Sequence, residues 1–193
     1  MDLVRASHLY KVFGKNERQV IERLKAGESR EELASLGTAA VIDVSFEVAK
    51  GETFVVMGLS GSGKSTLIRM INGLWSPSEG TVEVAGKVVS DMNDAQLRAL
   101  RRDHVSMVFQ HFALLPHLTV RENAAYGLKL QGKLKQKERL EKANEWLNTV
   151  GLNGWGDKYP HQLSGGMQQR VGLARALAAE TDILLMDEAF SAL

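Results

Sequence analysis

The stretch GLSGSGKST, residues 58–66, carries the strongest indication of the fold. It contains a glycine, four variable residues and then Gly-Lys-Ser, between the apolar run TFVVM at 53–57 and the helix-like run TLIRMING at 66–73. Glycines there let successive backbone N–H groups turn toward phosphate oxygens, and the start of a helix adds partial positive charge. The stretch therefore predicts a phosphate-binding loop between a buried strand and a helix.

Individual residues of this loop have distinct expected roles. Lys64 would reach the β- and γ-phosphates of a nucleotide, and the Ser65 hydroxyl would be a ligand of Mg²⁺. The alternative is a turn rich in Gly and Ser with a lysine by chance, which the flanking strand and helix disfavour. The expected nucleotide-binding residues of the loop are Gly58, Leu59, Ser60, Gly61, Ser62, Gly63, Lys64, Ser65 and Thr66.

Two adjacent acids, Asp187 and Glu188, follow the apolar run ILLM at 183–186. A parallel strand delivers its last side chains to the carboxyl edge of the sheet, where a phosphate loop also opens. Asp187 would hold Mg²⁺, through water, and Glu188 would orient or deprotonate the attacking water. A solvated strand end is the alternative interpretation; the phosphate loop in the same chain favours the catalytic one.

The composition is that of an ordinary globular protein, with 193 residues, 44% hydrophobic, 24% charged and a net charge of +1. A length of this order suits one substantial domain. The near-zero charge gives no general field for attracting nucleic acid or an anionic membrane. The absence of cysteine excludes disulfides and thiolate metal sites. No signal-like start and no run of about 18 apolar residues is found, so any membrane-spanning helices would belong to another subunit.

Residue patterning along the chain predicts an α/β fold of the P-loop NTPase class. Strand-like alternation at 44–48 and a hairpin near Ala85-Gly86 indicate an antiparallel β subdomain near the N-terminus, interrupted by a charged helical insertion at 15–38. A predominantly parallel sheet would form the core. We expect a single domain in which residues 1–110 form the first part of the core, 111–162 an α-helical subdomain, and 163–193 a helix followed by the acid-bearing strand.

The stretch LSGGMQQR at 163–170 is more restrictive than the phosphate loop. With it, the order of motifs along the whole chain resembles that of an ATP-binding-cassette subunit. The resemblance implies that this stretch opens a helix whose N-terminus caps the γ-phosphate of ATP held by a second copy, using Ser164, Gly165, Gly166 and Gln168. Met167 replaces the glutamine usual in the fifth position. The alternative is a glycine-containing loop that merely caps a helix.

The resemblance also assigns roles to residues that carry no signal by themselves. Gln110, after the strand-like SMVF, would contact Mg²⁺ or the attacking water. Phe13 would stack on adenine, with Tyr10 as the rival and burial in the core as the alternative for either. The apolar region Phe112–Leu115 would form a groove for a short helix of a membrane permease subunit, rather than only pack internally.

Four stretches most resemble the ATPase subunits of bacterial glycine betaine/proline importers: DEAFSAL at 187–193, the insertion at 15–38, MGLSGSGKSTLIRMING at 57–73 and MVFQHFALLPHLTV at 107–120. This resemblance implies ATP and Mg²⁺ as cofactors, a head-to-tail dimer of two ATPase subunits, permease subunits and, indirectly, a solute-binding protein. It places the subunit peripherally on the cytoplasmic face of the membrane. The alternatives are an ATPase for another solute, such as methionine or a polyamine, an exporter-associated cassette, a non-catalytic binder, and a cassette that handles nucleic acid.

Family members also carry a switch histidine downstream of the catalytic glutamate. All five histidines of this sequence lie upstream of Glu188. We therefore expect a cassette that is incomplete at its C-terminal side and that, as a 193-residue product, hydrolyses ATP poorly.

Overall fold

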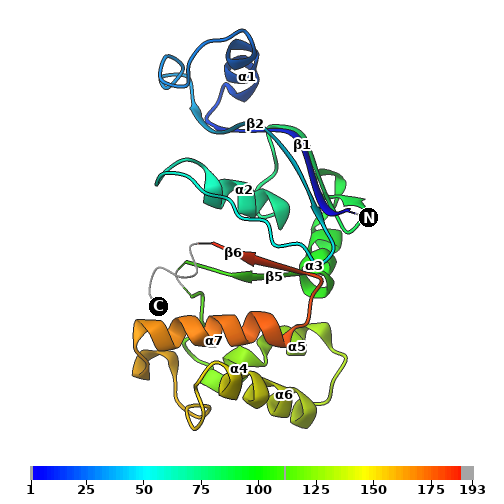
Figure 1. The fold of residues 1–193 in the computed structure, drawn as a ribbon, viewed down its shortest axis with the longest axis vertical. Coiled ribbons are helices and arrows are strands. Elements are labelled where there is room, and N and C mark those ends of the chain that lie inside the picture. Colours follow the sequence, from blue (N-terminus) through cyan, green and yellow to red (C-terminus); the bar gives the residue numbers. More distant parts are fainter. Residues whose placement is uncertain (1, 111, 188–193) are drawn as a thin grey trace. The chain divides into compact units, whose positions relative to one another are not determined.

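A computed structural model describes residues 2–110 and 112–187 of the chain. The chain forms two compact units, Met1–Leu97 and Arg98–Leu193, and each is described by itself. Figure 1 shows the elements of both units. Mixed strands and helices agree with the predicted α/β class.

The first unit contains a four-stranded antiparallel sheet in the order β2-β1-β3-β4. Its strands are β1 (Asp2–Phe13), β2 (Thr38–Ala49), β3 (Glu79–Val84) and β4 (Lys87–Val88). Along β2, the side chains of Val44, Phe46 and Val48 are partly buried while their neighbours are exposed, as the period of two requires. The predicted antiparallel subdomain is therefore present.

The turn between β3 and β4 is a two-residue hairpin loop. Ala85 and Gly86 have φ angles of 50° and 73°, and Val84 pairs with Lys87. Two central residues with positive φ match the twist of the adjoining strands. The expected hairpin position is confirmed.

The insertion forms a helix only in its first part. Helix α1 (Glu17–Lys25) buries Val20 and Ile21, and Gly27, with φ of 97°, follows its end. The remainder consists of turns, and its reciprocal bonds between Ser29 and Glu32 close one of them. One apolar cluster unites the insertion with β1 and β2; it contains Tyr10, Val12, Val20, Ile21, Leu33 and Ala39.

The predicted strand at 53–57 is not formed, which corrects one expectation. Val55 and Met57 are 67% and 86% exposed, and Phe54 stacks on Phe46 with ring centroids 4.9 Å apart. A strand requires a backbone partner, and neither described sheet includes this run. Helix α2 (Lys64–Ile71) does follow the loop as expected. The chain continues through the 3₁₀ turn η1 (Val89–Asp91) into helix α3 (Asp94–Asp103), in which the first unit ends at Leu97 and the second begins at Arg98.

The second unit combines a parallel strand pair with a group of helices. Strands β5 (Val105–Val108) and β6 (Ile183–Met186) pair in register from Val105–Ile183 to Val108–Met186. The helices are α4 (Val120–Ala124), α5 (Tyr126–Gln131), α6 (Gln136–Thr149), the 3₁₀ turn η2 (Pro160–Gln162) and α7 (Gly165–Ala178).

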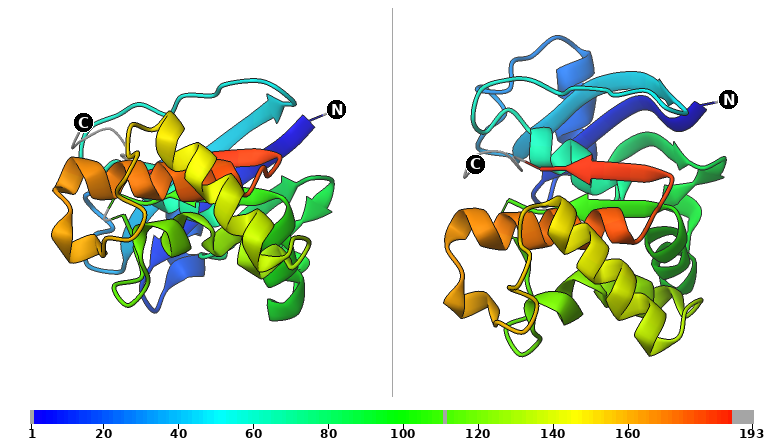
Figure 2. Two further views of the ribbon diagram at one scale, coloured as in Figure 1. Left: turned by 90° about the horizontal axis from the view of Figure 1, so that it is seen from below. Right: turned by 60° about the horizontal axis from the view of Figure 1, so that its bottom comes forward.

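Helix α7 lies between the strand pair and helices α4 and α6 (Figures 1 and 2). Its flank toward the helices belongs to a core cluster of Val120, Ala124, Ala125, Ala143, Leu147, Leu152, Leu163, Val171 and Ala174. Ala143 and Leu147 are the contributions of α6 to this cluster. Helices α4, α5 and α6 all fall within 111–162, where the sequence predicts a helical subdomain. No helix in the described ranges is long and apolar enough to cross a bilayer.

Candidate nucleotide-binding site

The phosphate loop of the first unit requires glycine at its junction with α2. Gly63 has φ of 93°, and a Cβ there would lie 2.0 Å from the carbonyl oxygen of Ala40. No other residue fits that space or favours that angle. Gly61, with φ of 77°, also has left-handed backbone. The loop therefore makes the tight turn expected before a helix, and Gly63 is required both by its φ angle and by the approach of Ala40 of β2.

Lys64 is the first residue of α2, and its side chain bends back over the loop. The Nζ atom donates to the carbonyl oxygens of Gly58 at 3.0 Å and Leu59 at 2.8 Å. The Ser62 amide donates to the Leu59 oxygen at 3.2 Å. An ammonium, a helix start and left-handed glycines at one place fit an anionic phosphate group.

In the second unit, the parallel pairing brings two of the predicted site residues to one sheet edge. Asp187 follows β6, is 1% exposed, and donates its amide to the Val108 oxygen at 3.1 Å. Gln110 is exposed and lies two residues beyond the end of β5. Because β5 and β6 run parallel, both residues lie at the same carboxyl edge. Glu188, the expected catalytic base, lies outside the described residues.

The signature stretch begins α7 as the sequence predicts. Ser164 is the N-cap, and its hydroxyl accepts from the Met167 amide at 3.3 Å. Gly165 and Gly166 form the first turn, and a Cβ added at Gly165 would meet nothing within 4 Å. The Gln168 side chain donates to the Leu163 oxygen at 3.2 Å. Met167 packs against the helical core cluster, so the fifth position makes an apolar contact.

Tyr10 and Phe13 have different surroundings in the first unit. Tyr10 is 5% exposed and belongs to the cluster beneath the insertion. Phe13 is half-buried and meets the ring of Trp75 edge to face, with centroids 5.1 Å apart and planes at 84°. The Lys11 Nζ lies 5.2 Å from the Phe13 centroid. Tyr10 is therefore a core residue, and Phe13 is the more accessible of the two rings.

Two residues that sequence reasoning missed organise the chain after β5. The fully buried Asn123 side chain donates to the oxygens of Leu115, Leu118 and Thr119 at 3.0–3.1 Å, and accepts from the Leu115 amide at 2.8 Å. Arg175 of α7 donates to two carbonyl oxygens in the same segment. Their types gave no signal, because an asparagine after a helix start and an arginine late in a helix are ordinarily solvated.

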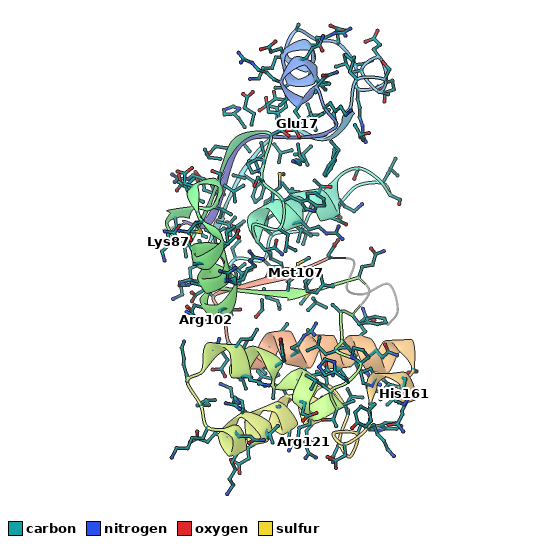
Figure 3. All side chains as sticks on the ribbon, turned by 180° about the vertical axis from the view of Figure 1, so that it is seen from behind. Glu17, Lys87, Arg102, Met107, Arg121 and His161 are labelled. Atoms are coloured by element: carbon teal, nitrogen blue, oxygen red, sulfur yellow. The ribbon has the colours of Figure 1, made fainter. Side chains whose placement is uncertain are left out.

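Arg121 connects helix α4 to the rest of the helical group through its side-chain contacts. Its Nε donates to Asn144 of α6 at 2.8 Å, and its Nη2 pairs with Asp157 at 3.1 Å; Figure 3 labels this side chain. The capping box of Thr119 and Glu122 flanks Arg121 in the first turn of α4. Together these contacts hold the start of α4 in place.

The expected Mg²⁺ ligands Ser65, Gln110 and Asp187 belong to different units, and their joint role stays a prediction. Within 2–110 and 112–187, no group of three or more His, Asp or Glu side chains is arranged to hold a metal.

Comparisons with known proteins agree with these features. A profile of the ABC transporter family matches residues 41–191. The glycine betaine transport ATP-binding protein OpuAA of Bacillus subtilis is 53% identical over 192 residues, which is 98% of this chain and 46% of that protein. The methionine import ATP-binding protein MetN of the same species is 52% identical over 154 residues, 80% of this chain and 45% of its own length. The chain thus spans about half the length of these curated relatives.

A solved structure supports the fold directly. It is the dimeric post-hydrolysis state of an ATP-binding cassette bound to ADP and Pi; it is 34% identical, with a TM-score of 0.84 over 98% of this chain and 75% of that one. The family match covers most of the chain, and the motifs fall in the family's order. The chain therefore belongs to the ATP-binding-cassette family of ABC transporter ATPases.

Proposed function

We propose that this chain binds and hydrolyses ATP to power a bacterial importer of glycine betaine- or proline-type osmoprotectants. The observation that carries the proposal is the phosphate loop, in which Gly63 permits the turn and Lys64 lies over the loop at the start of α2. A helix start with an ammonium beside it suits the phosphates of ATP.

The remaining site residues would complete the chemistry in the roles that the family resemblance implies. Ser65, Gln110 and Asp187 offer hydroxyl, amide and carboxylate oxygens, the donor type that Mg²⁺ prefers. Bound Mg²⁺ would neutralise charge that develops on the transferred phosphoryl group. Glu188 would orient or deprotonate the attacking water. Phe13, with its ring steadied by Trp75, would stack on adenine.

The proposed partners would bind at the signature helix and at the segment after β5. Ser164, Gly165 and Gly166 would face the γ-phosphate bound by a second copy, and the dimeric solved relative supports that assembly. Permease subunits would contact the Phe112–Leu115 region, where Leu114 packs on the helical core and Phe112 and Leu115 remain half-buried. A solute-binding protein would act indirectly, on the far side of the membrane. The subunit would lie peripherally on the cytoplasmic face.

The solute class is supported by the extent of the match. The relative named for glycine betaine matches 98% of the chain, whereas the methionine relative matches 80%. Transport of labelled glycine betaine and methionine by the complete system would test this choice. Methionine uptake without betaine uptake would contradict it. A nucleic-acid partner is not proposed, because a net charge of +1 gives no basic surface field.

The enzymatic proposal is tested in the assembled transporter with Lys64→Ala and Glu188→Gln. Lys64→Ala should weaken ATP binding, because it removes the cation nearest the phosphates. Glu188→Gln should keep ATP binding but lower turnover by roughly 100-fold or more, the range of a lost general base. Lys87→Ala, at an exposed strand position, is the matched control. Wild-type turnover of the Glu188 variant would refute its role.

A further inference from the structure

The guanidinium of Arg175 joins the last turn of α7 to the chain that follows Gln110. Its Nη1 donates to the Ala113 oxygen at 2.7 Å, and its Nη2 donates to the Phe112 oxygen at 3.0 Å. The planar fork of an arginine can reach two neighbouring carbonyl groups at once, which the single ammonium of a lysine cannot do in the same geometry. One side chain thus fixes two successive peptide groups.

The backbone at these two residues adopts an unfavourable conformation. Phe112 and Ala113 have φ angles of 53° and 48°, in the left-handed region that non-glycine residues rarely occupy. Such a conformation persists only when surrounding contacts impose it. The Phe112 amide also donates to the Phe109 oxygen at 3.1 Å, which brings the chain back toward the residue before Gln110. Gln110 therefore lies within a segment whose far side is held by Arg175.

Among the described residues, the charge of Arg175 is compensated mainly by these two carbonyl oxygens. Burial lowers the pKa of its guanidinium, although an arginine remains protonated in proteins. Within residues 2–110 and 112–187, no carboxylate forms an ion pair with it, so the Phe112 and Ala113 oxygens are its charge-assisted partners. A partly buried cation without hydrogen-bond acceptors would be costly, which ties its position to this backbone.

We propose that Arg175 is a positioning residue for ATP hydrolysis: its fork locks the left-handed backbone at 112–113 and thereby sets the position of Gln110. The proposal rests on the function proposed above for Gln110. The helix that begins at the signature Ser164 also carries Arg175 in its last turn. A shift of α7 is therefore passed to the segment after β5 through a pair of hydrogen bonds.

Hydrogen exchange of the full chain tests, independently of activity, whether Arg175 holds the backbone at 112–113. Arg175→Met keeps an unbranched apolar stem but removes the donors, and it should raise exchange in 109–115 by on the order of tenfold. Arg170→Met is the matched control, because Arg170 on the same helix donates to the Val150 oxygen at 3.1 Å. Arg170→Met should raise exchange around residues 149–152 instead. Unchanged exchange at 109–115 in Arg175→Met would overturn the lock.

Turnover in the assembled transporter tests the positioning role. Arg175→Met should lower kcat roughly tenfold while the Kd for ATP changes less than about twofold, the pattern of a group that acts after binding. Ala113→Gly relieves the left-handed strain, so adding it to Arg175→Met should restore part of kcat. If Arg175 had a purely structural role, Arg170→Met would lower kcat as much as Arg175→Met does, and Ala113→Gly would restore none of it. That result would overturn the proposal. If exchange responds but Gln110→Ala leaves kcat unchanged, the lock holds and the role of Gln110 fails.

Discussion

Among single residues, Tyr10 and Phe13, the two candidates for stacking on adenine, differ in burial. Both are aromatic residues near the end of β1, and a shift in strand register falls between Leu9 and Lys11. Tyr10 points into the cluster beneath the insertion, with the Lys25 Nζ 5.4 Å from its ring centroid. Phe13 instead lies beside Trp75 with its ring partly accessible. The two rings therefore have different surroundings, and the role of Phe13 at a nucleotide stays a prediction.

We predict that Phe13→Ala weakens ATP binding by about 5- to 150-fold, corresponding to the roughly 1–3 kcal/mol of a base stacked on an aromatic ring. Isothermal titration of the full chain with ATP measures this directly. Tyr10→Ala is the contrasting variant: it should lower the free energy of unfolding by about 3–5 kcal/mol, as for other large-to-small aromatic changes in a core. An unchanged ATP affinity in Phe13→Ala would remove Phe13 from the site.

At the scale of elements, helix α4 depends on the capping box at its start. Thr119 accepts from the Glu122 amide at 3.2 Å, and Glu122 accepts from the Thr119 amide at 2.8 Å. The Thr119 amide and hydroxyl lower the pKa of the Glu122 carboxyl below its ordinary value of 4.5. A carboxylate with a depressed pKa stabilises the fold above its unfolded pKa, and this contribution disappears as pH falls through the folded pKa.

Glu122→Ala should therefore lower the free energy of unfolding by about 1 kcal/mol at pH 7, a typical contribution of a helix cap. The difference from wild type should shrink as pH falls below the ordinary value of 4.5 and through the lowered pKa of the folded state, because the wild-type carboxyl then becomes protonated. Urea unfolding at pH 7 and pH 3 measures both values. Thr119→Ser, which keeps the hydroxyl, should retain the pH dependence. A loss of unfolding free energy in Glu122→Ala that is identical at the two pH values would contradict this account.

The run at 53–57 shows the limit of element prediction. Its apolar residues favour a strand, yet Val55 and Met57 are exposed and form no part of either sheet. Helix α7 shows the opposite case, since Ser164 and two glycines define its start by local hydrogen bonds. A helix satisfies its backbone within its own residues, whereas a strand depends on a partner that may lie anywhere in the chain.

At the scale of the whole molecule, the proposed site needs two copies. Lys64 would come from one copy and Gly165 from the other, so an equal mixture of Lys64→Ala and Gly165→Asp subunits should recover activity that neither has alone. Random pairing predicts up to about a quarter of wild-type turnover in transporters reassembled with permease. Lys64→Ala mixed with Ser65→Ala, which damages the same half-site, should stay inactive. No recovery in the first mixture would refute the head-to-tail arrangement.

Features whose hydrogen bonds close within a few residues could be predicted from the sequence. The phosphate loop, the Ser164 cap and the hairpin at Ala85-Gly86 were all predictable, because glycine angles and capping distances are fixed by local spacing. The family resemblance then supplied roles for residues such as Gln110.

Contacts between groups far apart in the sequence became visible only in the folded chain. The tertiary structure separated Phe13 from Tyr10, left 53–57 without a strand partner, and paired Arg175 with the backbone of 112–113, some 62 residues earlier. The physical reason is that such contacts follow the path of the folded chain. Neither the type of a residue nor its neighbours in sequence specify which carbonyl group a side chain will reach.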